Sequence, residues 1–239
     1  MSKQNNSCYD KYIKCKSKYK NLKNKYLQTT KIDYITKINT NILKNRFPYK
    51  KGLDFTKLQV TESSKYSMST NKSSKLLVNI IKKYFPKNKD ITITDGTSNV
   101  GSDTVMLAMN FKKVNAIELS DITCKALIHN IKEYKQDNVK VFCGNVIDVI
   151  KETKQDVIYV DPPWGGPKYK YHSKLKLFLD NIEISEFYRL NKFRAKLFIF
   201  RVPINYDFIY FFKKVNSPKY EVYSYIENDK IKYYYLVLK

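Results

Sequence analysis

The sequence predicts an α/β protein with a doubly wound, mostly parallel sheet. From residue 91 onward, short apolar runs typical of buried strands alternate with segments of helical periodicity. The chain then ends in two tyrosine-rich runs joined by Asn228-Asp229, a pattern typical of an antiparallel hairpin. With 239 residues, 43% of them hydrophobic, the chain is long enough for one sizeable domain and an extension.

The individual elements follow from periodicity and from residues that begin or end helices. Strands are expected at 91–94, 114–117, 139–142, 157–160, 196–200, 220–226 and 231–238. Helices are expected at 31–46, 73–85, 103–111, 120–134, 146–152, 182–192 and 206–213. Ser73 and Ser74 are the expected cap of the second of these helices, and Pro86 is expected to end it.

The N-terminal segment is rich in lysine. Between Asp10 and Leu27, apolar residues recur at spacings of three and four, which predicts a further helix. Lysines cover the rest of this helix, either as a solvated face or as a surface for the phosphates of a nucleic-acid strand. We expect residues 1–60 to form a basic helical extension and residues 61–239 to form the main domain.

The net charge is +23, because 45 Lys and Arg residues stand against only 22 Asp and Glu residues. This charge attracts polyanions, so nucleic acid is the leading ligand class and an anionic membrane surface is the competing one. No apolar run approaches the roughly 20 residues that span a bilayer, and the polar N-terminus is no secretory signal. We expect a soluble, intracellular monomer of the cytoplasm or nucleus.

The abundance of Lys, Asn, Ile and Tyr indicates an A+T-rich genome, such as that of a large DNA virus, which would place the protein in the host cytoplasm. The four cysteines, Cys8, Cys15, Cys124 and Cys143, have no C-x-x-C spacing, and only two histidines accompany them. We therefore expect free, mostly buried thiols and no metal site.

Residues 159–169, Tyr-Val-Asp-Pro-Pro-Trp-Gly-Gly-Pro-Lys-Tyr, are the most informative segment. A strand ends at Asp161, and Pro162 and Pro163 prevent both a strand and a helix from continuing. The stiff turn suits an exocyclic amine of a nucleobase, because the Asp161 carboxylate and the Pro162 carbonyl can accept its two N–H bonds. The Trp164 ring would then lie against the base plane. The competing interpretation is a proline-rich loop after a sheet strand.

A second group of polar residues follows the earlier strands. The loop that begins Asp95-Gly96-Thr97 comes after the first strand, where open α/β sheets bind their ligands. Glu118 ends the second strand 23 positions beyond Asp95, where an acid can bind both hydroxyls of a ribose. Asp95 would meet the ammonium of a methionine moiety, which favours S-adenosylmethionine as the cofactor. Asn145, after the third strand, either meets the adenine amino group or forms a strand-end turn.

A dinucleotide cofactor could use the same ribose acid. Against it, the loop is not Gly-x-Gly-x-x-Gly, and an Asp-Pro-Pro-Trp turn has no role in hydride transfer.

Three separated segments together resemble the trimethylguanosine synthases. They are Asp161–Pro167 with Tyr169, Tyr66–Ser69, and Phe187–Lys192. The resemblance covers roughly residues 45–239 and implies a class I, Rossmann-like, S-adenosylmethionine-dependent methyltransferase with a seven-stranded sheet. It further implies methyl transfer to N2 of a 7-methylguanosine RNA cap, a triphosphate-linked structure. The RNA backbone would meet the basic surface.

The resemblance also implies roles for individual residues. Trp164 would stack on the methylated guanine, and Ser67 and Ser69 would line the site between cofactor and cap. Lys168 and Tyr169 would contact the triphosphate bridge.

The sequence departs from the family pattern at several positions. Thr97-Ser98-Asn99 replaces much of the usual first loop, and Asn145 stands where an aspartate is usual. Ile204 replaces a usual arginine, so either Arg201 takes the phosphate-binding role or no residue does. Tyr66 either adds a second aromatic wall at the base or packs within the fold.

Alternative functions remain open at this point. The same turn serves N6-adenine methyltransferases of DNA or RNA, and a relative acting on N2 of internal guanines would explain the basic extension. A third alternative is a catalytically dead module that binds caps.

Overall fold

The computed structural model describes residues 33–86, 90–216 and 219–239, and the predicted helix at 10–27 lies outside these ranges. The chain divides into two compact units, Met1–Tyr34 and Ile35–Lys239. The second unit contains all the residues that the sequence analysis assigns to a functional site.

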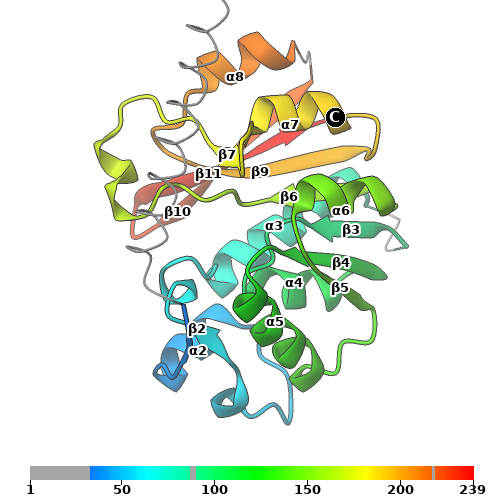
Figure 1. Ribbon diagram of the computed structural model, residues 1–239, viewed down its shortest axis with the longest axis vertical. Helices are drawn as coiled ribbons and strands as arrows, with labels where there is room; N and C mark the ends of the chain where they lie inside the picture. Colours follow the sequence, from blue (N-terminus) through cyan, green and yellow to red (C-terminus); the bar gives the residue numbers. More distant parts are fainter. Residues whose placement is uncertain (1–32, 87–89, 217–218) are drawn as a thin grey trace, which may run out of the picture. The chain divides into compact units, whose positions relative to one another are not determined.

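A seven-stranded sheet forms the centre of the second unit, in the order β10-β11-β9-β6-β3-β4-β5 (Figure 1). Its strands are β3 (Thr92–Asp95), β4 (Lys113–Glu118), β5 (Val139–Cys143), β6 (Val157–Val160), β9 (Leu197–Pro203), β10 (Tyr220–Glu227) and β11 (Lys230–Leu238). Parallel pairing joins the strands from β9 to β5, whereas β11 is antiparallel to both of its neighbours. The predicted mostly parallel sheet is confirmed.

The predicted C-terminal hairpin is confirmed as well, since β10 and β11 pair from end to end. The two residues of its turn, Asn228 and Asp229, have φ values of 51° and 55°. Two-residue loops with left-handed central residues match the twist of the flanking strands. Asn and Asp adopt that conformation more readily than other residues with a side chain.

Helices cover both faces of the sheet because strand side chains alternate between the faces. The helices are α2 (Thr40–Arg46), α3 (Asn71–Tyr84), α4 (Ser102–Ala108), α5 (Asp121–Glu133), α6 (Val146–Glu152), α7 (Ile184–Asn191) and α8 (Phe208–Val215). In β6, Ile158 and Val160 pack in a core with α6, α7 and α8, whereas Val157 and Tyr159 pack in a core with α3 and α4. Figure 1 shows α3, α4 and α5 on one side of the sheet and α6, α7 and α8 on the other.

The segment ahead of α3 packs against α5. Phe47 and Leu58 share a core cluster with Leu127 of α5. Gln59 exchanges two backbone hydrogen bonds of 2.8 Å with the amide of Asn130, also on α5. Residues 35–60 are therefore part of the compact unit.

The helix expected at 31–46 is wrong in its first half. Ile35–Thr36 form the short strand β1, which pairs antiparallel with β2 (Val60–Thr61), and α2 begins only at Thr40. Pairing with a distant strand outweighs the local helical periodicity here.

The expected cap of α3 is also wrong. The cap is Thr70, whose side chain accepts a hydrogen bond from the Ser73 N–H. Ser73 and Ser74 are buried inside the first turn, and the Ser74 hydroxyl donates to Asp103 at 2.5 Å. The other predicted helices and strands begin and end within three residues of the observed ones.

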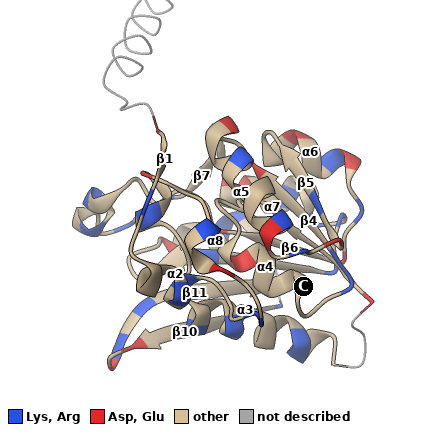
Figure 2. Cartoon of the chain, turned by 90° about the horizontal axis from the view of Figure 1, so that it is seen from below, with Lys and Arg blue, Asp and Glu red and all other residues tan. Residues whose placement is uncertain are grey.

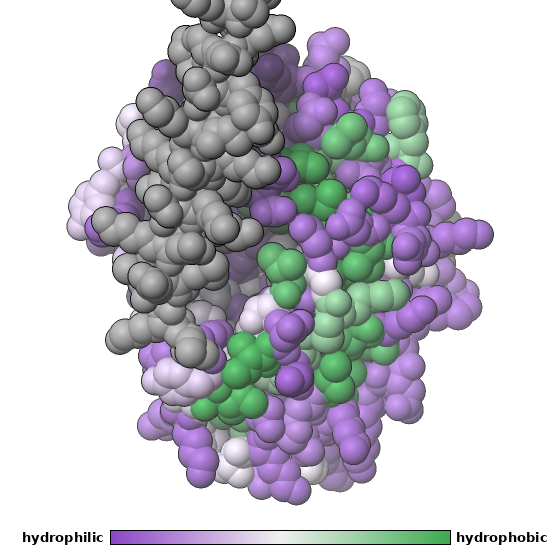
Figure 3. Space-filling view, viewed as in Figure 1, coloured by the Kyte–Doolittle hydropathy of each residue, from purple (hydrophilic) through white to green (hydrophobic). Residues whose placement is uncertain are grey.

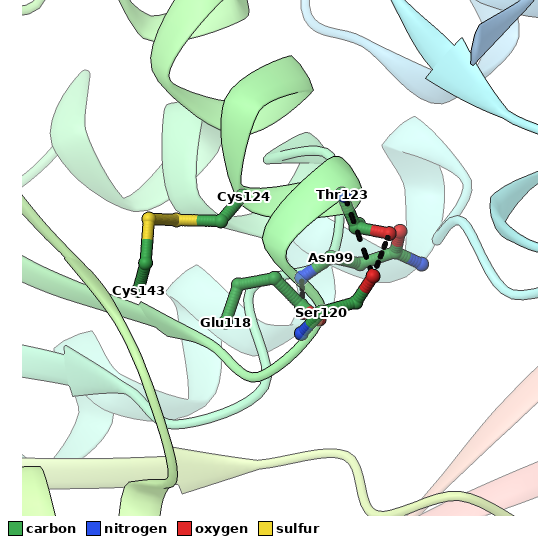
Figure 4. Close-up of a disulfide and its surroundings, with 6 residues drawn as sticks. All are labelled: Asn99, Glu118, Ser120, Thr123, Cys124 and Cys143. Carbon is green, nitrogen blue, oxygen red and sulfur yellow. Dashed lines mark hydrogen bonds between the residues drawn. A yellow bond between two sulfur atoms is a disulfide. The ribbon is translucent and has the colours of Figure 1, made fainter. Parts of the chain in front are cut away.

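The expectation of free thiols is wrong for two of the four cysteines. Cys124 in α5 and Cys143 at the end of β5 form a disulfide, with their Cα atoms 5.7 Å apart (Figure 4). Their spacing of 19 positions gave no signal, because the packing of α5 beside β5 brings them together. Cys8 and Cys15 lie outside the described residues.

Charged residues are spread over the described part of the chain. Figure 2 shows Lys and Arg on many of its helices and strands, with fewer Asp and Glu between them. Hydrophilic residues predominate on the face drawn in Figure 3, and hydrophobic residues form smaller separate areas. Among the described helices, none has both the length and the apolar character needed to cross a membrane.

Candidate active site

The predicted acids meet at one edge of the sheet. Asp95 ends β3, Glu118 ends β4 and Asp161 follows β6, and these strands are neighbours in the order β6-β3-β4. Because the strands are parallel, their carboxyl ends lie at the same edge. The chain continues from β3 to β4 and β5 on one side and returns to β6 on the other. This is the switch point at which open α/β sheets bind ligands.

The loop between β3 and α4 approaches the sheet closely. Gly96 N–H donates to the Tyr159 carbonyl at 2.8 Å. A Cβ on Gly96 would lie 2.8 Å from Val146 Cγ2 and 3.2 Å from Val160 Cγ2, so a side chain there would displace its neighbours. The loop ends at Gly101, whose φ of 98° favours glycine. The predicted Gly96 thus sets how near the loop lies to the ends of the strands.

Glu118 is held in place by backbone N–H groups. Its Oε2 accepts from Asn99 N at 2.8 Å and its Oε1 from Ser120 N at 2.9 Å (Figure 4). Its carbonyl accepts from Gly144 N at 2.8 Å, which ties the end of β4 to the end of β5. Asn99 has a φ of 51°, so the loop after β3 curls over this carboxylate. A carboxylate oxygen accepts more than one hydrogen bond, so this fixed group can also receive ligand hydroxyls.

Asp95 lies beneath the loop rather than at its mouth. The side chain is fully buried, and its Oδ2 accepts from Thr104 Oγ1 at 2.6 Å. Burial raises the pKa of this carboxyl to about 7, with a further contribution from the nearby Asp103 carboxylate. Thr97 N–H donates to Asp95 Oδ1 at 3.4 Å, so the side chain supports the loop from below. Contact with a cofactor ammonium stays a prediction.

Asn145 performs the strand-end role that the sequence analysis left open. It is the cap of α6, and its Oδ1 accepts from Ile147 N at 3.0 Å. An amide oxygen can accept a second hydrogen bond, so contact with an adenine amino group stays a prediction.

The turn after β6 joins the two halves of the site. Asp161 N–H donates to Thr97 Oγ1 at 2.8 Å, so the loop after β3 holds the start of the turn. The Asp161 side chain is 17% exposed, and its Oδ1 is buried without a hydrogen-bond partner among the described residues. Burial raises the pKa of this carboxyl to about 6, against the opposing charge of Arg201. Pro162 is buried and Pro163 is exposed.

Trp164 is half-buried between two tyrosines. Its ring meets Tyr169 and Tyr233 edge to face, with centroids 5.1 Å and 5.9 Å away. This packing fixes the orientation of the indole. Tyr66 is 84% exposed, and no ring contact in the described structure joins it to Trp164. A role of Tyr66 as a second aromatic wall therefore stays a prediction.

The two predicted serines lie at different depths. Ser67 is exposed, and its Oγ accepts from Asn99 Nδ2 at 2.7 Å, which links this segment to the loop after β3. Ser69 is 4% exposed, and its Oγ donates to Asp103 Oδ2 at 2.5 Å and accepts from Arg201 Nη1. Ser67 thus lies at the surface of the site, and Ser69 belongs to a polar network beneath it.

Lys168 and Tyr169 lie in the short 3-10 helix η3 (Pro167–Tyr171), which follows the turn. Lys168 is exposed, and Tyr169 is half-buried against the indole. Asn205, just after β9, donates to the Tyr169 carbonyl at 2.8 Å and to the His172 carbonyl at 2.6 Å. Sequence reasoning missed Asn205, because its contacts lie 36 and 33 positions away.

Arg201 lies inside the site. It is 6% exposed, its Nη2 forms an ion pair with Asp161 Oδ2, and its Nη1 lies 3.7 Å from Asp103 Oδ2. This placement argues against the phosphate-binding role that the sequence analysis left for Arg201. A buried guanidinium already engaged by carboxylates presents little surface to a phosphate.

Sequence reasoning also missed two partners of Arg201. Asp103 is 8% exposed and accepts hydrogen bonds from Ser74 and from Tyr159 OH, the latter at 3.0 Å. The Tyr233 ring centroid lies 5.1 Å from Arg201 Cζ. An acid among the apolar residues of α4 was the only available signal for Asp103, and nothing distinguished Tyr233 within its tyrosine-rich run.

Comparison with known proteins adds a family. Residues 90–239 match the model of the family described as RNA cap guanine-N2 methyltransferase. An uncharacterized protein, L320, of Acanthamoeba polyphaga mimivirus is 40% identical over 134 residues, which are 54% of this chain and 52% of that protein. The trimethylguanosine synthase of Schizosaccharomyces pombe is 30% identical over 84 residues, 32% of this chain and 35% of that protein. The chain thus spans about half the length of these curated relatives, or less.

Among solved structures, a putative class I S-adenosylmethionine-dependent methyltransferase from Listeria monocytogenes has the same fold. The TM-score is 0.54 at 12% identity, and the match covers 72% of this chain and 60% of that one. At this identity the likeness concerns the fold alone, and it confirms the class I architecture that the sequence predicts.

Proposed function

Because the chain belongs to the RNA cap guanine-N2 methyltransferase family, we propose that it methylates the exocyclic N2 of a 7-methylguanosine RNA cap. The product is a 2,7-dimethylated cap and, after a second transfer, a 2,2,7-trimethylated one. S-adenosylmethionine is the methyl donor. In this proposal the compact unit Ile35–Lys239 is the methyltransferase domain, and the lysine-rich part of the extension ahead of it contacts the RNA backbone.

The observation that carries this proposal is the state of Asp161. Its Oδ1 is buried without a hydrogen-bond partner of normal geometry among the described residues, and the indole N–H of Trp164, which is likewise unpartnered there, lies near enough to lower the pKa of the carboxyl. A buried acceptor left unpaired is costly, so a ligand donor is expected there. An exocyclic amine offers two such N–H bonds, one for Asp161 Oδ1 and one for the carbonyl of Pro162.

The residues at the ends of β3 and β4 fit the cofactor. Glu118 is preset by two backbone N–H groups and would receive the ribose hydroxyls. Gly96 keeps the loop close to the sheet, and the buried Asp95 supports this loop from beneath, on the side where the methionine end would bind. Asn145 would face the adenine end. When bound, the cofactor supplies an electrophilic methyl group.

The protein's own residues act by positioning rather than by covalent chemistry. The hydrogen bond from Asp161 N–H to Thr97 couples the base-holding turn to the cofactor loop, so the two cannot shift independently. With a pKa of about 6, the Asp161 carboxyl is mostly ionised at pH 7 and can accept an amine N–H. Stacking of a cationic 7-methylguanine on Trp164 contributes about 0.5–2 kcal/mol.

The test is methyl transfer from labelled S-adenosylmethionine to a panel of 7-methylated cap, unmethylated cap, uncapped RNA and DNA. We expect label on N2 of the 7-methylated cap. Asp161→Asn should lose most turnover, because it removes the charged acceptor without changing the size of the side chain. The matched control is Asp148→Asn, the same change at an acid whose side chain is 74% exposed on α6, which should keep the rate.

The other substrates separate the alternatives. Label in uncapped RNA or in DNA, with none in caps, would assign the enzyme to internal guanine or adenine. Tight binding of the 7-methylated cap without any transfer would assign a catalytically dead cap-binding module. Either result would overturn the proposal.

A further inference from the structure

A buried network of charges lies next to the amine-holding turn, and its centre is Arg201. We infer that Arg201 is a positioning residue that orients the Asp161 carboxylate, occupying one oxygen so that the other is directed to the substrate amine. The inference deepens the proposed function and rests on it for the identity of that amine.

The two terminal nitrogens of the guanidinium contact different groups. Nη2 pairs with Asp161 Oδ2 and also donates to the Ser67 carbonyl at 3.4 Å. Nη1 donates to Ser69 Oγ and lies 3.7 Å from Asp103 Oδ2. Arg201 therefore bridges the carboxylate of the turn and a second, fixed carboxylate.

Asp103 is the fixed end of this bridge. Its two oxygens accept from Ser69 at 2.5 Å, Ser74 at 2.5 Å and Tyr159 at 3.0 Å. These donors come from the segment before α3, from α3 and from β6, so Asp103 is held by three parts of the fold. Because Arg201 contacts this fixed carboxylate, its guanidinium holds the Asp161 carboxylate in a defined position as well.

The backbone of Arg201 is equally fixed. It lies within β9, paired with Tyr235 of β11, while its neighbour Phe200 pairs with Val160 of β6. All seven residues of β9 are buried, and Arg201 is the only charged one among them. A buried ion pair seldom adds more stability than apolar residues of similar size would. Stability alone is thus a weak reason for a charged residue in this strand.

The arrangement leaves Asp161 with one oxygen for a ligand. Oδ2 is taken by Arg201, and Oδ1 is buried and unpartnered among the described residues. A free carboxylate could rotate and present either oxygen, whereas a paired one presents a single acceptor in a set direction.

Arg201 also governs the ionisation of Asp161. The charged and titratable groups that act on Asp161 are Arg201 on β9 and Asp103 on α4, with Tyr159 on β6 and Tyr233 on β11 next to Arg201. Burial and Asp103 raise the pKa of the Asp161 carboxyl, whereas Arg201 and, to a smaller extent, Trp164 lower it. Without Arg201 the opposing effects remain, so the pKa rises above about 6 and the carboxylate is lost at higher pH.

The experiment compares Arg201→Met with Arg201→Lys in the full chain, and Arg189→Gln is the matched control. Arg189 lies in an exposed pair with Glu186 on α7, so its loss should change nothing at the site. The first readout is the titration of the Asp161 carboxyl by 13C NMR, assigned with Asp161→Asn. The second is the pH profile of kcat/KM, and calorimetry checks that cofactor affinity is unchanged.

We expect Arg201→Met to raise the pKa of Asp161 by at least about one unit, as loss of an adjacent opposite charge does. The acid limb of the pH profile of kcat/KM should shift to higher pH by the same amount. A rise of about two units in the pKa of Asp161 would lower the ionised fraction of this carboxyl at pH 7 about tenfold. Part of the loss should return at higher pH. Arg201→Lys should keep the limb near its original place and recover part of the rate.

Three results decide the inference. An Asp161 titration identical in wild type and Arg201→Met would overturn it, and so would an equal loss of rate at every pH. If Arg201→Met does not fold, Arg201→Gln removes the charge but keeps a donor for Ser69, and the same criteria apply. A shifted titration in a protein that methylates no cap would support the pairing and overturn the proposed function instead.

Discussion

Removal of the Cys124–Cys143 disulfide should lower the free energy of unfolding by about 3 kcal/mol. The two residues are 19 positions apart, so the bond closes a loop of about 20 residues. The loop-entropy relation gives about 11 cal/mol/K for that length, or about 3.3 kcal/mol at 25 °C. In a domain of about 200 residues each kcal/mol moves the melting temperature by roughly 2–4 °C, so a fall of roughly 7–13 °C is expected.

The assay is thermal unfolding of the wild type and of Cys143→Ser, with and without dithiothreitol. Cys143 is the exposed partner and Cys124 is fully buried, so the substitution disturbs the core little. Reductant should lower the melting temperature of the wild type to that of the variant and leave the variant unchanged. Cys8→Ser with Cys15→Ser is the control, because neither takes part in this bond. Equal melting temperatures without reductant, or four titratable thiols in the native protein, would refute the reasoning.

Three further predictions concern the ligands. Glu118→Ala should weaken the binding of S-adenosylmethionine, measured by calorimetry, by about 1.5–3 kcal/mol, as for the loss of hydrogen bonds to a charged group. A wild-type protein that binds NAD and not S-adenosylmethionine would contradict the assignment. The wild type should prefer the 7-methylated over the unmethylated cap by up to roughly 25-fold, and Trp164→Ala should erase most of this preference. A wild type without the preference would exclude the 7-methylated cap as the substrate. Deletion of residues 1–28 should weaken binding to long RNA. The slope of log affinity against log salt concentration should flatten by about 0.7 for each lost phosphate contact, while turnover of a cap dinucleotide stays intact. Equal loss on both substrates would make the segment part of the fold.

The sheet was predictable because its signals are local. Val157–Val160 is a continuous apolar run, as a parallel strand covered on both faces requires, and it is β6 without change of bounds. Asn228 and Asp229 favour the left-handed backbone conformation that the two-residue turn of the hairpin requires. Such features depend on neighbours in the chain, and a single sequence contains them.

The misplaced elements depend on distant partners instead. Ile35–Thr36 form a strand only because Val60–Thr61 lie beside them. Cys124 and Cys143 meet because a helix packs next to the strand that follows it. Neither relation leaves a periodic mark in the sequence.

The site was predictable in position but not in depth. Glu118 and Asp161 each come at the end of a predicted strand of a mostly parallel sheet, and the carboxyl ends of parallel strands share the edge where ligands bind. How deeply a side chain lies depends on packing, and Asp95, Ser69 and Arg201 all proved to be buried. Ser69 and Arg201 therefore contact each other and Asp103. Asp95 accepts hydrogen bonds from Thr104 and Thr97 instead.

The indole of Trp164 lies near one cation and is expected to hold another. Arg201 Cζ is 5.9 Å from its centroid, and a full positive charge there would weaken attraction for a 7-methylguanine cation. Asp161 and Asp103 offset that charge, so the ring can still favour a cationic base. The offset depends on ionised Asp161, whose pKa is about 6. Below that pH the amine loses its charged acceptor and Arg201 loses a counter-charge, so turnover and preference for the 7-methylated cap should fall together.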